Sequence, residues 1–293
     1  MQLGQIGIWT SALDRQPAKT ATAAAAEIDR LGYGALWVGE AIRREAFSNA
    51  ALLLSATKKV TVCTGIANIW ARDALAMKAG QFTLAEAWPD RFLLGIGVSH
   101  APLLSVRGQR YSKPLEVMAA YLEAMDNAPY DAPNPPIRPL RVLAALGPKM
   151  LELAGSKADG AHTYFVPVEH SEQARAILGP NRLLCAEQAV VLENSPAKAR
   201  EIARRHTRVY LGLSNYSNNL KRLGFDDDDL SGGGSDRLVD AIVAWGDVDA
   251  VAERIDSHLQ AGASHVAIQV LTDDPNTLPL SEWKILAEVL IDA

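Results

Sequence analysis

The sequence predicts an α/β barrel of eight strand–helix units, and three observations carry this prediction. Short apolar segments alternate with helical patterns along most of the chain, which is typical of βαβ units around a parallel sheet. The apolar segments are hydrophobic on both faces, as expected for strands that are covered on both sides. Eight such units close a barrel, whereas an open doubly wound sheet usually has fewer. We therefore expect a single (β/α)8 domain over residues 1–293.

The first four units occupy the N-terminal part of the chain. A β-branched segment such as 60–66 favours a strand, and a glycine directly after a helical pattern, as at Gly32, is typical of a helix end. The pattern predicts strands over residues 5–9, 35–38, 60–66 and 91–98. The helices that follow them are expected over residues 17–31, 47–58, 74–87 and 114–125.

The second four units follow a proline-rich segment, 127–139, which is expected to be an extended connection. The pattern predicts strands over 140–146, 160–165, 187–192 and 265–271, and helices over 148–155, 171–178, 197–211 and 280–290. Two extra helices, over 237–245 and 248–261, are expected before the last strand. Segment 216–235 joins four aspartates to three glycines, which predicts a mobile loop. A solvated linker and an active-site lid are both compatible with it.

Composition limits the class of protein. The formal net charge is −5, which argues against a nucleic-acid-binding protein, since these normally carry a basic patch. Alanine makes up about one residue in six, and this excess predicts many close-packed helices. Two cysteines are too few for a disulfide framework and suit a reducing compartment. No signal peptide or membrane-spanning segment is evident, and the histidines show no metal-ligand spacing. We expect a cytoplasmic protein that binds neither membrane nor metal.

In a barrel of this kind the active site lies at the carboxyl ends of the strands. Glu40 follows the second strand directly, and it is expected either to shape a loop by hydrogen bonding or to face a ligand. Gly65 lies within the third strand, where glycine indicates a bulge, a close approach of another group or simple packing relief. After the fourth strand, the sequence GIGVSHAP begins like a dinucleotide-binding motif but has His100 in place of the third glycine. It fails as that motif and remains a low-bulk loop that fits a ligand cradle.

The segment after the fifth strand is the best candidate for an anion site. Gly147 and Pro148 open a helix, so free backbone N–H groups lie at the positive end of the helix dipole. Lys149 in the first turn is unfavourable for the helix itself and indicates an anion shared with these groups. Helix N-termini of this kind bind phosphate. A phosphate site and an unoccupied loop both remain open from the residues alone.

Five segments together resemble the bacterial luciferase-like superfamily, and most closely its coenzyme F420-dependent oxidoreductases of actinobacterial type. They are ALWVGEA (35–41), VCTGIANIWARD (62–73), DRFLLGIGVSHAPL (90–103), RVLAALGPKMLELAGSKADGAHTYFV (141–166) and HVAIQVL (265–271). The third and fourth segments are quite specific in combination. The resemblance covers essentially the whole chain and implies a luciferase-like TIM barrel.

The resemblance implies a role for each loop. A cis peptide bond that does not involve proline would fall at Gly65–Ile66 and back the tricyclic ring of the cofactor. The residues expected to bind the cofactor are Gly65, Ile66, Ala67, Asn68, Gly97, Val98, Ser99, His100, Leu146, Gly147, Pro148 and Lys149. Sugar-phosphate dehydrogenases of the superfamily carry a catalytic histidine where this chain has Ala41, so that particular alcohol oxidation is not expected. His100 is the first candidate for proton transfer, and Glu40 is the second.

We expect an oxidoreductase that uses coenzyme F420 to transfer a hydride to or from a small organic substrate. A deazaflavin lacks the nitrogen that supports oxygen activation, which favours a reductase or dehydrogenase. The alternatives are an FMN-dependent monooxygenase, because both cofactors present a ring and a phosphate, and a non-catalytic deazaflavin-binding barrel. Relatives are commonly dimers, so a homodimer is expected. Helices 47–57 and 74–87 would supply its interface or else only pack on the barrel.

Overall fold

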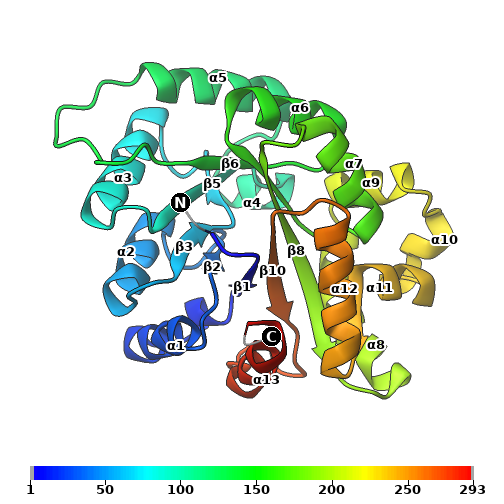
Figure 1. The fold of residues 1–293 in the computed structure, drawn as a ribbon. Helices are drawn as coiled ribbons and strands as arrows, with labels where there is room; N and C mark the ends of the chain where they lie inside the picture. Colours follow the sequence, from blue (N-terminus) through cyan, green and yellow to red (C-terminus); the bar gives the residue numbers. More distant parts are fainter. Residues whose placement is uncertain (1–2, 292–293) are drawn as a thin grey trace.

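A computed structural model describes residues 3–291 and confirms the barrel. Eight parallel strands form the closed ring β10-β1-β2-β3-β5-β6-β7-β8, which closes where β10 pairs with β8 (Figure 1). The short strand β4 extends the ring beside β5, and β9 extends it beside the carboxyl end of β8. The strands are β1 Ile6–Trp9, β2 Ala35–Val38, β3 Thr61–Thr64, β4 Ala67–Asn68, β5 Phe92–Gly97, β6 Arg141–Ala144, β7 Gly160–Thr163, β8 Leu183–Leu192, β9 Val243–Gly246 and β10 His265–Val270.

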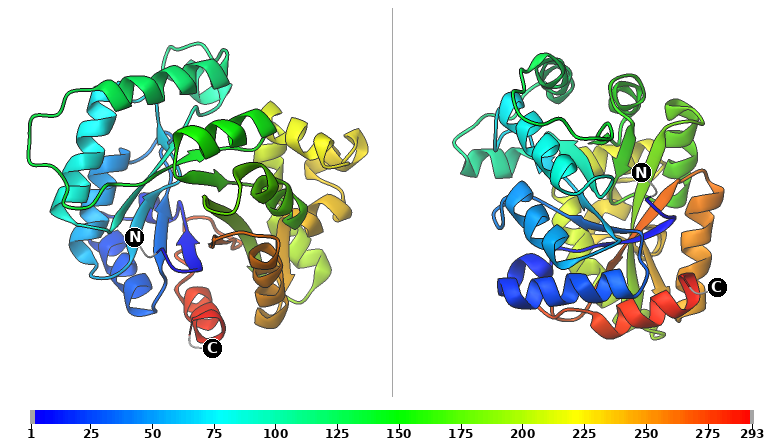
Figure 2. Two further views of the ribbon diagram at one scale, coloured as in Figure 1. Left: turned by 45° about the horizontal axis from the view of Figure 1, so that its top comes forward. Right: turned by 60° about the vertical axis from the view of Figure 1, so that its left-hand side comes forward.

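Helices surround the ring, as the two views of Figure 2 show. They are α1 Ala18–Arg30, α2 Ala46–Ala56, α3 Ala74–Ala87, α4 Ala101–Val106, α5 Pro114–Asn127, α6 Pro148–Lys157, α7 Val168–Leu178, α8 Pro196–Leu211, α9 Ser214–Arg222, α10 Asp227–Leu230, α11 Asp236–Ile242, α12 Val248–Gln260 and α13 Leu280–Leu290, with short 3-10 turns η1 Leu13–Arg15 and η2 Ser231–Gly233. None of the helices within residues 3–291 combines the length and apolar character needed to cross a bilayer.

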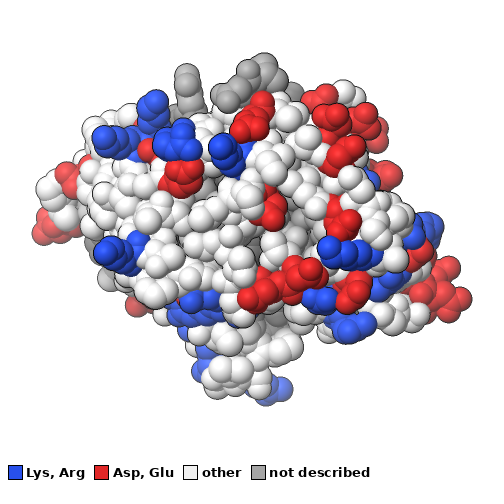
Figure 3. Space-filling model, turned by 90° about the horizontal axis from the view of Figure 1, so that it is seen from below, with Lys and Arg blue, Asp and Glu red and all other residues white. Residues whose placement is uncertain are grey.

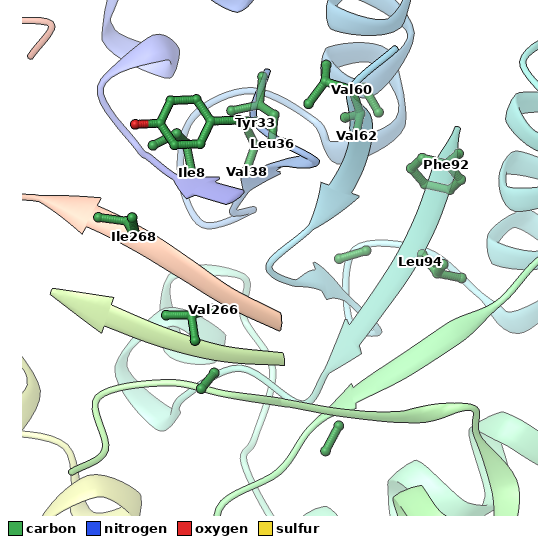
Figure 4. Packing of buried hydrophobic residues seen from close by; sticks show 14 of the residues in the cluster. Ile8, Tyr33, Leu36, Val38, Val60, Val62, Phe92, Leu94, Val266 and Ile268 are labelled. Carbon is green, nitrogen blue, oxygen red and sulfur yellow. The ribbon is translucent and has the colours of Figure 1, made fainter. Parts of the chain in front are cut away.

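The largest hydrophobic core lies between the strands and the helix ring. Outward-facing strand residues such as Ile8, Leu36, Val62 and Ile268 pack under the helices with almost no exposure (Figure 4). The many small alanines of α1 and α2 allow these helices to lie close to the sheet. This arrangement confirms the sheet covered by helices on its outer face, which the alternation of apolar segments and helical patterns predicts.

A smaller core fills the barrel interior and includes Trp37, Cys63 and Cys185. Trp37 stacks on His162 at 4.4 Å between ring centroids and donates from Nε1 to Nε2 of His265 at 3.0 Å. Nε2 of His265 accepts this bond while Nδ1 donates to the carbonyl of Gly4, so the ring is neutral, and burial lowers its pKa to about 4. Both cysteines are free thiols.

The prediction of a mobile loop over 216–235 is wrong. Asp226 caps α10 through a reciprocal hydrogen-bond pair with Asp229, and Asp229 also forms an ion pair with Arg237. The glycines Gly232–Gly234 adopt positive φ in a compact turn against α8. The aspartates therefore serve as caps and ion-pair partners, and a third hydrophobic core around Phe165 and Leu220 holds α8, α9 and α11 together.

Two further expectations need correction. The helix expected over 237–245 ends at Ile242, and Val243–Gly246 forms β9 because it pairs with the extended end of β8. The sequence also missed α4, which follows the β5 loop directly. The extended connection expected over 127–139 is confirmed, since α5 ends at Asn127 and β6 begins at Arg141.

On the face shown in Figure 3, acidic and basic side chains are interspersed.

Candidate functional site

A cavity of about 660 Å³ opens among the loops that follow the strands. Its wall is built by η1, by the loops after β2, β3, β5 and β6, by β7, and by α8 and α9. Much of the wall is aromatic, with side chains that come from five different parts of the chain: Trp9, Tyr111, Tyr164, Tyr210 and Tyr216. The fold thus places one mixed apolar and polar cavity where ligands bind in barrels of this type.

The turn between β3 and β4 brings the chain very close to its neighbours. The peptide bond between Gly65 and Ile66 is cis, as the resemblance implies, and both residues line the cavity. A Cβ on Gly65 would lie 2.6 Å from Nε1 of Trp9, and a Cβ on Gly97 would lie 2.5 Å from Cγ1 of Ile66. Both positions therefore require glycine because of the close approach. Ala67 and Asn68 form β4 and lie behind this wall, outside the cavity lining.

Glu40 lines the cavity with a buried carboxylate whose two oxygens are both occupied. Arg72 forms an ion pair with it through Nη1 and Nη2, and the Arg72 side chain is only 9% exposed. The backbone N–H of Asn68 donates to Oε2 at 2.8 Å, and that of Ala46 donates to Oε1 at 3.2 Å. Glu40 therefore joins the loop after β2 to β4 and α2. Of the two roles expected from the sequence, this arrangement corresponds to shaping the loop by hydrogen bonding.

The loop from β5 to α4 places four predicted residues, Gly97–His100, on the cavity wall. His100 precedes the first turn of α4, and its ring lies 5.4 Å from that of Tyr216 between centroids. Burial lowers the pKa of His100, while a hydrogen bond with the Asn215 side chain acts in the opposite direction. Both contacts come from α9, so this helix orients the imidazole toward the cavity.

The helix start at α6 has a different cation from the one that the sequence predicts. Leu146 and Gly147 line the cavity, whereas Pro148 and Lys149 are exposed and do not. Arg222 of α9 lies beside the helix start instead, because a Cβ on Gly147 would be 3.3 Å from its Nη2. Nη2 of Arg222 also donates to Oδ1 of Asn219 at 2.9 Å. An exposed helix N-terminus and a guanidinium therefore face the same end of the cavity, which is a suitable arrangement for phosphate.

Sequence reasoning missed several lining residues. Trp9 ends the first strand and Asp14 follows it, whereas His162 and Tyr164 lie at the carboxyl end of β7, the strand of the sixth unit. The rule that strand ends carry the site could have identified these four. Residues from α9 had no such signal, because their segment resembled a loop. Burial lowers the pKa of His162 to about 4, so that its ring is neutral, with Nδ1 donating to the carbonyl of Cys185.

The fold and the cavity define a ligand-binding α/β barrel whose loops can hold a phosphate at one end and a planar group against a glycine-rich wall. Residues 3–265 match the profile of the luciferase-like monooxygenase family. The chain belongs to this family and is a luciferase-like oxidoreductase.

Three similar proteins illustrate the range of the family. A Mycobacterium tuberculosis protein, whose name proposes a coenzyme F420-dependent oxidoreductase, is 23% identical, covering 92% of this chain and 94% of the relative. An F420-dependent secondary alcohol dehydrogenase, solved with an F420–acetone adduct, has a TM-score of 0.77 at 17% identity, with 98% of each chain covered. The FMN-bound oxygenating component of 3,6-diketocamphane monooxygenase from Pseudomonas putida has a TM-score of 0.72 at 14% identity, with 97% and 95% covered. These two structures support the fold, and they show that it accommodates either cofactor.

Proposed function

We propose that this chain is a coenzyme F420-dependent oxidoreductase that transfers a hydride between the deazaflavin and a small organic substrate. The observation that carries the proposal is the arrangement of the cavity, with a cationic helix start at Gly147 and Arg222 and a close-packed wall at Gly65, Ile66 and Gly97. The Mycobacterium tuberculosis relative and the alcohol dehydrogenase structure support the choice of F420 over FMN.

The residues present fit such a cofactor. In the first turn of α6, Pro148 has no N–H group, and the N–H of Met150 donates to the carbonyl of Gly147. The N–H of Lys149 has no helical partner within residues 3–291, and Arg222 adds a positive charge beside it, so this end of the cavity suits the phosphate. Gly65 and Gly97 line the cavity without a side chain, so this part of the wall suits a planar ring. When bound, F420 supplies the carbon that gives or accepts the hydride.

His100 is the residue that we assign to proton transfer. Its lowered pKa keeps the imidazole largely neutral near pH 7, so a ring nitrogen can accept a proton from the substrate or return one. Asn215 and Tyr216 orient the ring toward the cavity. Glu40 has no free oxygen for such a step because Arg72 and two backbone N–H groups occupy its carboxylate. We therefore assign Glu40 a positioning role.

Cofactor choice is tested by equilibrium binding of purified protein to F420 and to FMN. We expect F420 to bind at least tenfold more tightly. Tighter binding of FMN would overturn the proposal in favour of a flavin-dependent monooxygenase, and binding of neither would remove the cofactor assignment altogether.

The proposed phosphate-binding end of the cavity is tested with variants of two cationic residues, one that lines the cavity and one that does not. Arg222→Met is expected to weaken F420 binding about tenfold, because a charged hydrogen bond is lost. Lys149→Ala is the matched control and should change the affinity less than about twofold, since its side chain lies outside the cavity. The opposite ranking would place the phosphate on the outer side of α6.

The role of His100 is tested with His100→Ala. We expect turnover to fall by about 100-fold, the usual contribution of a proton-transfer group, while the dissociation constant for F420 changes less than twofold. Unchanged turnover would remove His100 from the mechanism. Tight F420 binding by the wild-type protein, without hydride exchange to any substrate in a broad panel, would support a non-catalytic barrel.

A further inference from the structure

Three polar side chains at one corner of the cavity have no part in the proposed cofactor site. Asp14 comes from η1, Arg43 from the loop after β2, and Tyr210 from α8. We call these three residues the polar corner. They lie far apart in the sequence, yet all of them line the same cavity.

Asp14 has one oxygen occupied and one that remains for a ligand. Nδ2 of Asn49 donates to its Oδ1 at 2.9 Å, which fixes the orientation of the carboxyl group. Burial raises the pKa of Asp14 to about 6, although the charges of Arg43 and Arg44 and the bond from Asn49 act in the opposite direction. The group therefore titrates within the range in which the protein is expected to work.

Arg43 has no hydrogen bond or ion pair among residues 3–291. Its charge nevertheless lowers the pKa of both Asp14 and Tyr210, so the guanidinium lies close to both groups. The neighbouring Arg44 differs, because its Nη2 donates to the carbonyl of Gln16 at 2.8 Å and its side chain does not line the cavity. Arg43 is thus a cation within the cavity wall whose donors are unoccupied.

We propose that the polar corner binds the carboxylate of the organic substrate. Only the identification of that molecule as the reacting substrate rests on the proposed function. Arg43 supplies charged donors that match a carboxylate. Protonated Asp14 supplies an O–H donor beside it. The aromatic wall, which includes Tyr111, Tyr210 and Tyr216, supplies a surface for an apolar or aromatic body.

The charge of the corner makes binding dependent on pH. Below about pH 6, Asp14 is neutral and the corner carries the single positive charge of Arg43. Above that pH the Asp14 carboxylate repels an anionic ligand. The other ionisable groups that face the corner or line the cavity are Arg44, Tyr210, His100, His162, Glu40, Arg222, Tyr111, Tyr164 and Tyr216. Arg72 neutralises Glu40, and burial keeps the tyrosine hydroxyls and His162 neutral around pH 7.

The proposal is tested by equilibrium binding of benzoate and of its neutral isostere benzamide to the full chain, with and without saturating F420. At about pH 5 we expect benzoate to bind at least fivefold more tightly than benzamide, and we expect its affinity to fall about tenfold by pH 8. Benzamide should show no such fall. Equal affinities of the two probes, or no binding of benzoate at millimolar concentration, would overturn the proposal.

Two variants assign the effect to the corner. Arg43→Met should abolish the preference for benzoate, and Asp14→Asn should keep the preference but lose the fall between pH 5 and 8. Arg44→Met is the matched control and should keep the preference for benzoate, with the fall in affinity moved to slightly higher pH because the charge of Arg44 also lowers the pKa of Asp14. Thermal unfolding of each variant checks that it is folded, and a folded Arg43→Met protein that still prefers benzoate would contradict the inference.

F420 binding, measured on the same preparations, separates this inference from the proposed function. If F420 binds and the benzoate preference is absent, the carboxylate site is wrong and the cofactor assignment stands. If the preference is present and F420 does not bind, the cofactor assignment is wrong and the carboxylate site stands.

Discussion

Arg43 lines the cavity, whereas Arg72 lies outside its lining and contacts the cavity residue Glu40, and the two arginines have opposite environments. The Arg72 side chain is 9% exposed and forms ion pairs with Glu40 and Glu45, whereas Arg43 is exposed and has no partner among the described residues. A buried charge must be paired within the protein, because an unpaired one carries a large desolvation cost. A charge at an open cavity is solvated until a ligand arrives. The paired side of the site therefore maintains its architecture, and the unpaired side is available for recognition.

The strongest test of this comparison is Glu40→Ala, which removes the more buried of the two carboxylate partners of the Arg72 guanidinium. We expect the free energy of unfolding to fall by about 3–5 kcal/mol, the usual result when one member of a buried ion pair is lost. Urea denaturation followed by circular dichroism measures this loss. The double variant Glu40→Gln with Arg72→Met should recover part of it, and a loss below about 1 kcal/mol for Glu40→Ala would contradict the architectural role.

Glu187 on β8 extends the comparison to a carboxyl group that is buried without a cationic partner. Its Oε2 accepts from the backbone N–H of Phe165 at 3.0 Å, its Oε1 is unpartnered, and burial raises its pKa from 4.5 to about 8. Between about pH 4.5 and pH 8, Glu187 is therefore protonated in the folded state and ionised in the unfolded state. We expect the free energy of unfolding to fall by about 3 kcal/mol as pH rises from 5 to 8.

Glu187→Gln is the matched variant, because it keeps the shape and cannot ionise. Its unfolding free energy should change less over the same pH range, so its stability relative to the wild-type protein should increase with pH. Parallel pH profiles for the two proteins would show that Glu187 does not titrate in this window. The measurement is a series of urea melts at constant ionic strength.

Arg43→Met has the smallest expected effect on folding. Because this guanidinium has no partner to leave unpaired, the free energy of unfolding should change by less than about 0.5 kcal/mol. Arg72→Met, measured alongside it, should be destabilising by several times that amount, since it leaves Glu40 buried without its cation. Similar losses of unfolding free energy for the two arginine variants would contradict the distinction between a paired and an unpaired arginine.

Much of the fold was predictable because its signals are local. The helices expected over 74–87 and 280–290 have those bounds in the structure, since each contains a continuous helical pattern with an end signal. Segment 216–235 was not predictable in this way. Aspartate and glycine favour loops in isolation, and only the contacts of α10 and η2 with α8 and α11 make them helical.

The residues of the candidate site differ in the same way, since some were predictable from local sequence and others were not. Gly97, Ser99 and His100 were identifiable because they lie at or just after the carboxyl end of one strand, β5. Arg222 and Asn215 were not, because α9 reaches the cavity from a segment far along the chain. The expected role of Lys149 shows the limit of the helix-start argument, which predicts an anion site without predicting which cation accompanies it.

The sequence by itself determined the barrel, the order of its strands and the loops that carry the site, because hydrophobic periodicity and strand ends are properties of short segments. Only the tertiary structure decided which charges are paired. Arg72 meets Glu40, Arg222 meets the start of α6, and Arg43 meets no partner among the described residues. These outcomes depend on distances between side chains remote in the chain and on how far each is removed from water.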